Sequence, residues 1–497
     1  MKRRIFTALI LSSAVCTTGI YGCNSQQAGQ MPASQPVQTD ISLEKSTIKT
    51  TDKNHENDTT KATDNTSVKN LTDDLGIEVC IDYEIDSYAP VQDFSYRLFK
   101  ENIDSENPVL SPISAYLALS MAAEGASGDT EKEFIDALGG GEDKMLVYSD
   151  SIMNNMHAES EGIKLSINNS AWLDDSLDVN TQWLGTVKSL MDADIFQSQL
   201  SDTATMNAIN DWTSTNTNGL IDKLLTEPLS DAARLALINT VYFKADWQEP
   251  FDANDTRTEE FTLEEGKGKV EVDMMNKYYE PCQYIANDFA EGVILPYKSP
   301  SPDISTAPCN LAFVALKQRN YALADTDDGV YNLYSIPADG TYNSADMISN
   351  GIREDVYNKL TAEVIADLLV NVSTETVKLK LPKFEITFDK ILNDSLENIG
   401  IKDAFDAEFA DFGGIGTDKD GQNIFISLVR QKAKIIVDEQ GTEAAAATEA
   451  IMECGAVEEP QQPIELYFDS PFVYMIVDMN TEIPLFIGIM DNPSGGM

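Results

Sequence analysis

The chain has 497 residues, and 82 acidic residues against 35 basic ones give it a formal net charge of −47 at pH 7. Nucleic acids and acidic polysaccharides bind to clustered lysine and arginine, so this charge argues against both as partners and is best explained by solubility. The six cysteines are widely and irregularly spaced, which predicts neither a metal site nor a disulfide framework, and we expect no metal and no cofactor.

The N-terminus has the pattern of a bacterial secretory signal peptide. Residues 2–4 are basic, residues 5–15 are mostly apolar, and Ile20-Tyr21-Gly22-Cys23 places a small residue before a cysteine. We expect residues 1–22 to be a signal peptide of the lipoprotein type and Cys23 to carry a lipid anchor, the chain's only contact with a membrane. Ordinary secretory cleavage is the alternative, because Tyr21 is larger than the residue usual at that position. Both interpretations predict an extracellular protein, lipid-anchored at the cell surface or secreted.

Residues 23–82 are predicted to form a disordered tether. From Asn24 to about Thr72 the sequence is mainly Ser, Thr, Asn, Gln, Lys and Asp, which cannot bury enough apolar surface to offset chain entropy. The remaining residues, 83–497, exceed the usual size of one hydrophobic core, so length alone would suggest two domains. No proline- or glycine-rich break divides them, however.

A buried helix is predicted to begin after Ser111. This serine can cap the helix, and Pro112 suits its first turn. The sequence that follows is apolar nearly all round, which indicates burial. Ser114 lies in the first turn of this core helix.

Two apolar strands are predicted further along the chain. The first is Ala236-Leu237-Ile238-Asn239-Thr240-Val241-Tyr242-Phe243-Lys244-Ala245-Asp246-Trp247, and a core role is the simplest interpretation of its tryptophan. The second is the β-rich stretch that follows Gln431 and ends at Val437.

The stretch from 437 to 453 is the most unusual part of the chain, because small side chains follow an apolar strand and Gly441. With a strand period of two, its residues divide between two faces. One face is small and nearly uncharged: Thr442, Ala444, Ala446, Thr448, Ala450 and Met452. The other face carries three carboxylates: Glu443, Ala445, Ala447, Glu449, Ile451 and Glu453. Such a segment suits an exposed loop and also a tight slot in a sheet. An alanine-rich linker or short helix is the alternative, since Ala and Glu are good helix formers.

Together these motifs resemble those of serpins, a family of serine protease inhibitors. The stretch from 437 to 453 is similar to the family's hinge and reactive loop. Two later segments, Ser470-Pro471-Phe472-Val473 and Pro484-Leu485-Phe486-Ile487-Gly488, are similar to its C-terminal strands. The segments Ser111-Pro112-Ile113-Ser114 and Gly125-Ala126-Ser127-Gly128-Asp129-Thr130 match the part of the family that lies beneath the main sheet. The resemblance covers residues from about 83 to 495.

The resemblance implies one α+β domain, residues 83–497, with the serpin fold and a metastable native state. A serpin fold has a large five-stranded main β-sheet, two further sheets, about eight to nine helices and an exposed reactive loop, here at about 439–465. The hinge it implies comprises Glu439, Gly441, Thr442, Glu443, Ala444, Ala445, Ala446, Ala447 and Thr448.

The resemblance also implies a region where the main sheet opens, formed by Ser111, Ser114, Asn239, Trp247 and Gln431. Most serpins carry a histidine where this chain has Gln431. An amide can still bridge Ser111, Ser114 and Asn239 by hydrogen bonds, so we expect a working latch that does not depend on protonation.

The function that the resemblance implies is irreversible, suicide-substrate inhibition of a serine protease. The protease would attack the loop and form an acyl-enzyme, and the cleaved loop would enter the main sheet and trap the covalent complex. Family spacing places the scissile bond at Gly455-Ala456, and the long loop widens the candidates to the residues between Met452 and Val457. None of these is Lys or Arg, which favours an elastase-like or subtilisin-like target over a trypsin-like one.

Two alternatives compete with inhibition, an enzyme and a binding protein. Beyond the tether the only histidine is His157, and no catalytic motif surrounds it, so we expect no enzyme activity and no catalytic residues. A non-inhibitory serpin-fold surface lipoprotein, acting as a binding module, is the second alternative. The absence of proline between Gly441 and Glu459 argues against it, because a proline would remove a strand hydrogen-bond donor. We expect a monomer.

Overall fold

The computed structural model describes residues 68–442 and 462–496, with gaps at 74, 78, 82, 265–266, 289, 300–308, 320, 325–331 and 336–358. The predicted signal peptide and Cys23 lie outside the described residues. The same is true of loop residues 443–461, which include the hinge from Glu443 to Thr448 and the predicted scissile bond at Gly455-Ala456.

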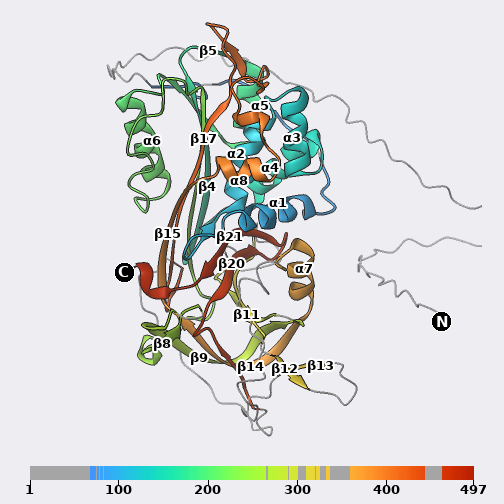
Figure 1. Ribbon diagram of the computed structural model, residues 1–497, viewed down its shortest axis with the longest axis vertical. Helices are drawn as coiled ribbons and strands as arrows, with labels where there is room; N and C mark the ends of the chain where they lie inside the picture. The colour runs from blue at the N-terminus through green and yellow to red at the C-terminus, as the bar shows by residue number, and fades with distance from the viewer. Residues whose placement is uncertain are drawn as a thin grey trace, which may run out of the picture. The chain divides into compact units, whose positions relative to one another are not determined.

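Eight α-helices lie within the described part of the chain: α1 (Ala89–Lys100), α2 (Pro112–Ala123), α3 (Gly128–Leu138), α4 (Glu142–Asn155), α5 (Thr181–Met191), α6 (Thr203–Asn216), α7 (Ala362–Val370) and α8 (Asn393–Asn398). Every residue of α2 is buried, as its sequence predicts. In Figure 1, α6 lies on one face of the main sheet, while α2, α3, α4, α5 and α8 gather on the other. None of the described helices combines the length and apolarity that crossing a bilayer requires.

The main sheet has five long strands: β6 (Asp194–Ser198), β4 (Ile163–Asp174), β7 (Leu235–Asp246), β17 (Ile426–Val437) and β15 (Phe384–Ile391). Three short strands complete it: β1 (Lys69–Asn70) beside β6, β3 (Ala158–Ser160) beside β4, and β18 (Gly441–Thr442) between β7 and β17. The five long strands match the predicted main sheet, and Figure 1 shows several of them running together through the domain.

A second sheet has nine strands: β19 (Ile464–Tyr467), β14 (Val372–Pro382), β9 (Lys269–Ala286), β10 (Ala290–Pro296), β11 (Leu311–Gln318), β20 (Phe472–Asp478), β21 (Ile483–Met490), β2 (Val109–Leu110) and β8 (Arg257–Thr262). Every residue of β20 and β21 is buried, which explains their almost unbroken apolar sequences. Two small pairs join β12 (Tyr321–Ala324) to β13 (Asn332–Ser335) and β5 (Leu177–Val179) to β16 (Gly416–Asp418).

The described residues between 68 and 81 correct the predicted boundary of the tether. Lys69 and Asn70 pair with β6, and the Leu71 N–H donates to the Ile195 carbonyl at 2.7 Å. The Val79 N–H donates to the Ser189 hydroxyl on α5 at 2.9 Å. Alternating apolar residues at Ile77, Val79 and Ile81 explain why this part folds onto the domain, since they can cover one face while the polar residues face water.

Candidate functional site

The site lies where β7 and β17 separate. These strands are parallel and pair directly from Leu235 and Ile426 up to Ile238 and Arg430. At the far end, β18 lies between them, and Thr442 pairs with both Ala245 and Val437. Between these points lie residues 239–244 of β7 and 431–436 of β17, which we call the facing edges. Among the described residues, the facing edges do not pair with each other.

Gln431 lies at the fork, one residue beyond the last direct pair. Its side-chain oxygen Oε1 accepts a hydrogen bond from the Ser111 N–H at 2.8 Å, and its side-chain nitrogen Nε2 donates to the Ser111 backbone carbonyl at 2.7 Å. Both residues are buried. This pair of bonds ties β17 to the residue that precedes α2.

Asn239 lies at the same fork on β7 and belongs to a second set of contacts. The Ser114 hydroxyl donates to the Asn239 side-chain oxygen, and the Asn239 amide donates to that of Asn169 on β4. The Asn169 amide in turn donates to the Met191 carbonyl at 2.8 Å. The predicted single bridge is therefore wrong in detail. Gln431 contacts the Ser111 backbone, while Ser114 and Asn239 are joined separately and extend to Asn169, a residue that the sequence did not reveal.

Trp247 holds the turn between β17 and β18. Its indole Nε1 donates to the Asp438 carbonyl at 2.9 Å, and its backbone N–H donates to the Gln440 carbonyl at 2.7 Å. The ring stacks on Tyr297, with 4.7 Å between centroids and 9° between planes. Trp247 thus anchors the hinge as well as filling the core.

Thr442 is buried at the start of the inserted strand. Its hydroxyl lies 2.6 Å from the Tyr297 hydroxyl, in a hydrogen bond in which either group can be the donor. Burial raises the pKa of Tyr297 above its ordinary value, so this phenol stays neutral. A Cβ on Gly441 would lie 2.0 Å from the Ala245 carbonyl oxygen, so only glycine fits beside β7 at this position. Tyr297 is a functional candidate that the sequence did not single out.

Glu439 is held by three contacts on the opposite side of the turn. Its carboxylate lies 2.7 Å from the Lys383 ammonium and accepts a hydrogen bond from the Thr256 hydroxyl at 2.7 Å. Its carbonyl accepts from the Phe251 N–H at 2.8 Å. Burial alone would raise the pKa of Glu439, but the hydrogen bonds from Lys383 and Thr256 outweigh it and lower the pKa.

Asp438, its neighbour, behaves in the opposite way. Its carboxylate accepts the N–H groups of Gln440 and Gly441 at 2.9 and 3.2 Å and so shapes the turn. Burial nevertheless raises the pKa of Asp438, because it exceeds the effect of these two hydrogen bonds.

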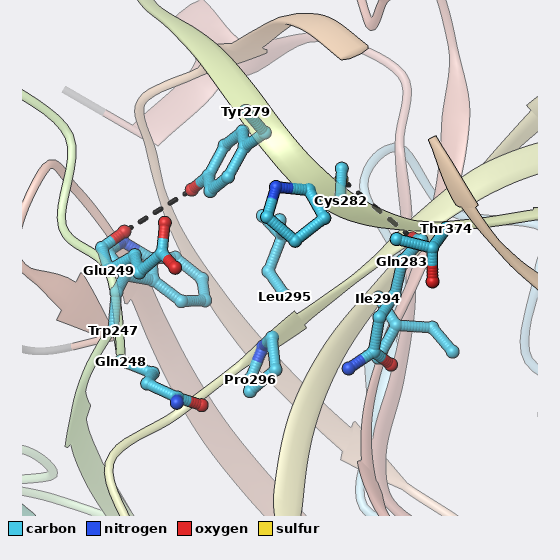
Figure 2. Close-up of a pocket in the computed structure, with 11 residues that line it drawn as sticks. Trp247, Gln248, Glu249, Tyr279, Cys282, Gln283, Ile294, Leu295, Pro296 and Thr374 are labelled. Atoms are coloured by element: carbon cyan, nitrogen blue, oxygen red, sulfur yellow. Dashed lines mark hydrogen bonds between the residues drawn. The ribbon is translucent and has the colours of Figure 1, made fainter. Parts of the chain in front are cut away.

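A pocket of about 280 Å³ shares Trp247 with the hinge (Figure 2). Its lining comes from the segment after β7 and from β9, β10 and β14: Trp247, Gln248, Glu249, Tyr279, Pro281, Cys282, Gln283, Ile294, Leu295, Pro296 and Thr374. The Tyr279 hydroxyl donates to the Glu249 carbonyl at 3.3 Å, which closes one side. Burial raises the pKa of the Cys282 thiol to about 12, so this thiol is neutral at physiological pH.

The described residues thus bring Ser111, Ser114, Asn239 and Gln431 together at the fork, and Glu439, Gly441, Thr442 and Trp247 together at the hinge, about six residues farther along the same strands. Within the described ranges, no cluster of histidine, cysteine or carboxylate side chains could hold a metal ion. The arrangement is a two-residue strand, β18, that lies between β7 and β17 at one end of their unpaired facing edges.

Comparison with known proteins gives one consistent family. The profile of the family described as Serpin (serine protease inhibitor) matches residues 89–306 and 335–493. A serpin-like protein of Thermococcus kodakarensis is 32% identical over 412 residues, which are 82% of this chain and 85% of the relative. Neuroserpin of Mus musculus is 28% identical over 411 residues, which are 80% of this chain and 89% of the relative.

Solved structures agree with these relatives. The crystal structure of the thermophilic serpin tengpin in the native state matches with a TM-score of 0.71 at 30% sequence identity, over 86% of this chain and 99% of that chain. Tengpin in the latent state matches with a TM-score of 0.63 at 28% identity, over 82% of this chain and 99% of that chain.

Proposed function

Because the chain belongs to the serpin family, we propose that it is an irreversible, suicide-substrate inhibitor of serine proteases. Serpins as a class act on serine proteases as inhibitors and not as catalysts. Here the protease would cut the loop that follows Thr442, at a bond between Met452 and Val457, and remain attached as an acyl-enzyme. The freed loop would then extend β18 between β7 and β17 before water completes the reaction.

The observation that carries this proposal is the position of Thr442. It already pairs with Ala245 on one side and Val437 on the other, so β18 is the first step of a strand antiparallel to both neighbours. The register of every following residue is thereby fixed, because each step forward along the loop is one step backward along both strands.

This register sends the small face of the loop into the core. Ala444 would face Phe243 and Ile435, and Ala446 would face Val241, all on the side of the sheet that packs against α2 and not on the side of α6. Thr448 lies six residues after Thr442, so it would arrive between Asn239 and Gln431, six residues before Ala245 and Val437. Small side chains with at most one hydroxyl can enter there without leaving a buried charge.

The energy of insertion comes from new strand pairing. Each inserted residue adds backbone hydrogen bonds to β7 and β17, and each bond contributes about 1 kcal/mol net. The stretch from Gly441 to Gly455 spans roughly 45 Å when extended at about 3.3 Å per residue, enough to carry a bound protease along the main sheet. The latch at Ser111 and Gln431 has to yield on this path, which supports a native state that is trapped until cleavage.

We further propose an elastase-like or subtilisin-like target, because the candidates between Met452 and Val457 include no basic residue. The signal-like N-terminus supports action outside the cell, either from a lipid anchor at Cys23 or as a secreted monomer.

Incubation with pancreatic elastase and with subtilisin tests the proposal, and trypsin serves as the control protease. We expect an adduct that survives SDS, loss of protease activity in proportion to the inhibitor added, and release of a C-terminal peptide whose mass locates the cut. Clean loop cleavage that leaves all of the protease active would instead support the non-inhibitory binding module.

A further inference from the structure

The outer face of the main sheet carries a group of cations beside the facing edges. Arg430, Lys432 and Lys434 alternate along β17, and Lys244 lies on β7, all half-buried. Their strand neighbours Val429, Gln431 and Ile435 point the other way, into the core. The chain as a whole carries a net charge of −47.

Carboxylates of the edge strand β15 already hold part of this group. Arg430 donates from Nε and Nη2 to the two oxygens of Asp389, at 2.8 and 2.9 Å. Lys432 lies 3.5 Å from Asp389, and Lys434 lies 2.7 Å from Glu385. A carboxylate arriving from the other side of β17 would therefore meet cations first, with the acidic residues of β15 one strand further away.

The register set by β18 brings the acidic face of the loop to these cations. Glu443 is one residue beyond Thr442, which places it opposite Lys244, one residue before Ala245. Glu449 is seven residues beyond Thr442, which places it opposite Arg430, seven residues before Val437. Arg430 pairs directly with Ile238 in the intact protein, so this pair has to part before Glu449 reaches it. The side chains would also lie on the same face of the sheet. In this register the odd-numbered loop residues and the even-numbered residues of β7 and β17 all point to the outer face.

We infer that the outer face of β7 and β17, along the facing edges and at the adjoining Ile238–Arg430 pair, is a docking site for the carboxylate face of this chain's own cleaved loop, with Glu443 on Lys244 and Glu449 on Arg430. The inference rests on the proposed function. It adds that ion pairs between the loop and the two strands fix the register of the inserted strand. Directly opposed residues on neighbouring strands have Cβ atoms only about 5 Å apart, close enough for an ion pair. A slip by one residue would turn these carboxylates into the apolar core, which makes the pairing a register check as well as an attraction.

The decisive measurement is the number of inhibitor molecules consumed per protease molecule inactivated, which we call the consumption ratio. This ratio depends on how fast the loop inserts relative to hydrolysis of the acyl-enzyme, and it does not depend on how fast the two proteins meet. We expect Glu449→Gln to raise this ratio about two- to fivefold, in keeping with the loss of one cross-strand charge pair. Glu449→Asp keeps the carboxylate and should stay near the wild type. Glu458→Gln removes a loop carboxylate beyond the reach of β7 and β17 and is the matched control.

Salt supplies an independent readout. Raising the salt concentration to about 1 M shortens the Debye length to roughly 3 Å, so the wild-type ratio should rise, while that of Glu449→Gln should change less. The double variant Arg430→Gln/Glu449→Gln should be no worse than either single variant if the two residues act as a pair. Should Arg430→Gln destabilise the native fold through Asp389, the comparison of Glu449→Gln with Glu449→Asp still decides.

The heat resistance of the cleaved protein distinguishes failure of the charge pairing from failure of the proposed inhibitory function. Wild type cut C-terminal to Glu453 should resist heat far better than the intact chain if the loop inserts. If it does, and Glu449→Gln matches the wild type in both ratio and salt response, the charge pairing is wrong while the inhibitory function stands. If cleavage brings no gain in heat resistance, the proposed function fails and this inference fails with it.

Discussion

The indole nitrogen of Trp247 donates a hydrogen bond to the backbone carbonyl of Asp438 at 2.9 Å. The same residue's backbone N–H reaches the Gln440 carbonyl at 2.7 Å, so one tryptophan holds both sides of the turn from which the loop departs. Stacking on Tyr297 keeps the ring in place, and Tyr297 contacts Thr442. The hinge is thus connected to the second sheet through two aromatic rings.

Replacing Trp247 by Phe should weaken the hinge while retaining a ring against Tyr297. The loss of the Nε1 donor leaves the Asp438 carbonyl without this bond, and we expect a decrease of about 1 kcal/mol in the free energy of unfolding, measured with denaturant. Trp183→Phe is the matched control, because its indole nitrogen also donates to a buried carbonyl, that of Met121, at 2.9 Å. Only the Trp247 variant should shorten the time for which intact protein keeps its inhibitory capacity on storage. Equal lifetimes for both variants would contradict a special role of Trp247 at the hinge.

Thr442→Arg should convert the inhibitor into a substrate. Thr442 is 2% exposed and faces Tyr297 in the intact protein, so an arginine there would either bury a charge or displace β18 from its place between β7 and β17, and the strand from which insertion proceeds would be lost. Thr442→Ser keeps the hydroxyl and should still form the SDS-resistant adduct. The measurement is the ratio of adduct to cleaved free inhibitor on a denaturing gel. Adduct formation by the arginine variant at the wild-type level would defeat the insertion argument.

Gln431→His should make stability depend on pH where the natural residue does not. The Ser111 N–H donates to residue 431, so a histidine there must be neutral to accept it. Burial and this hydrogen bond would lower the folded-state pKa below the usual value of about 6.5. Stability should therefore fall as the pH drops below about 6.5, by about 1.4 kcal/mol per pH unit until the folded-state pKa is reached. Parallel curves for the variant and the wild type between pH 7 and pH 5 would show that residue 431 does not carry the latch.

Glu439→Gln should cost stability mainly above the ordinary carboxyl pKa. Contacts with Lys383 and Thr256 lower the pKa of Glu439 below 4.5, so its contribution is complete above pH 4.5 and is lost as the pH falls through the lowered value. We expect a difference of about 1 kcal/mol at neutral pH, modest because Lys383 is partly exposed to solvent. The difference in the free energy of unfolding between the wild type and Glu439→Gln should disappear at acidic pH. Asp438→Asn should show the opposite trend, because the pKa of Asp438 is raised and its ionisation above 3.8 disfavours the folded state.

The local part of the site could be predicted from the sequence. The start of α2 at Pro112 follows from capping and apolar content, and the small residues Gly441 and Thr442 occur in a strand within the main sheet. The small residues that follow them lie outside the described residues, so their entry into the sheet stays a prediction. The family resemblance then brings Ser111, Asn239 and Gln431 into one region, and the structure places all three at one fork.

Contacts between distant strands could not be predicted in the same way. The Tyr297 hydroxyl meets Thr442 across 145 residues of sequence, and Lys383 reaches Glu439 from the start of β15. Neither residue has a local signal that distinguishes it from other core tyrosines or surface lysines, because the contact depends on strand order and register. The segment near Ile77 and Val79 did carry a signal, its alternation of apolar residues, which the polar composition around it concealed.

The two-residue strand β1 has a consequence for any shortened form of this protein. Lys69 and Asn70 occupy the hydrogen-bonding edge of β6 at Gln197 and Phe196. A fragment beginning at residue 89, where the family match begins, would leave that border of the sheet bare. Uncovered borders of this kind recruit strands from other molecules, so such a fragment would be prone to self-association for a reason unrelated to its reactive loop.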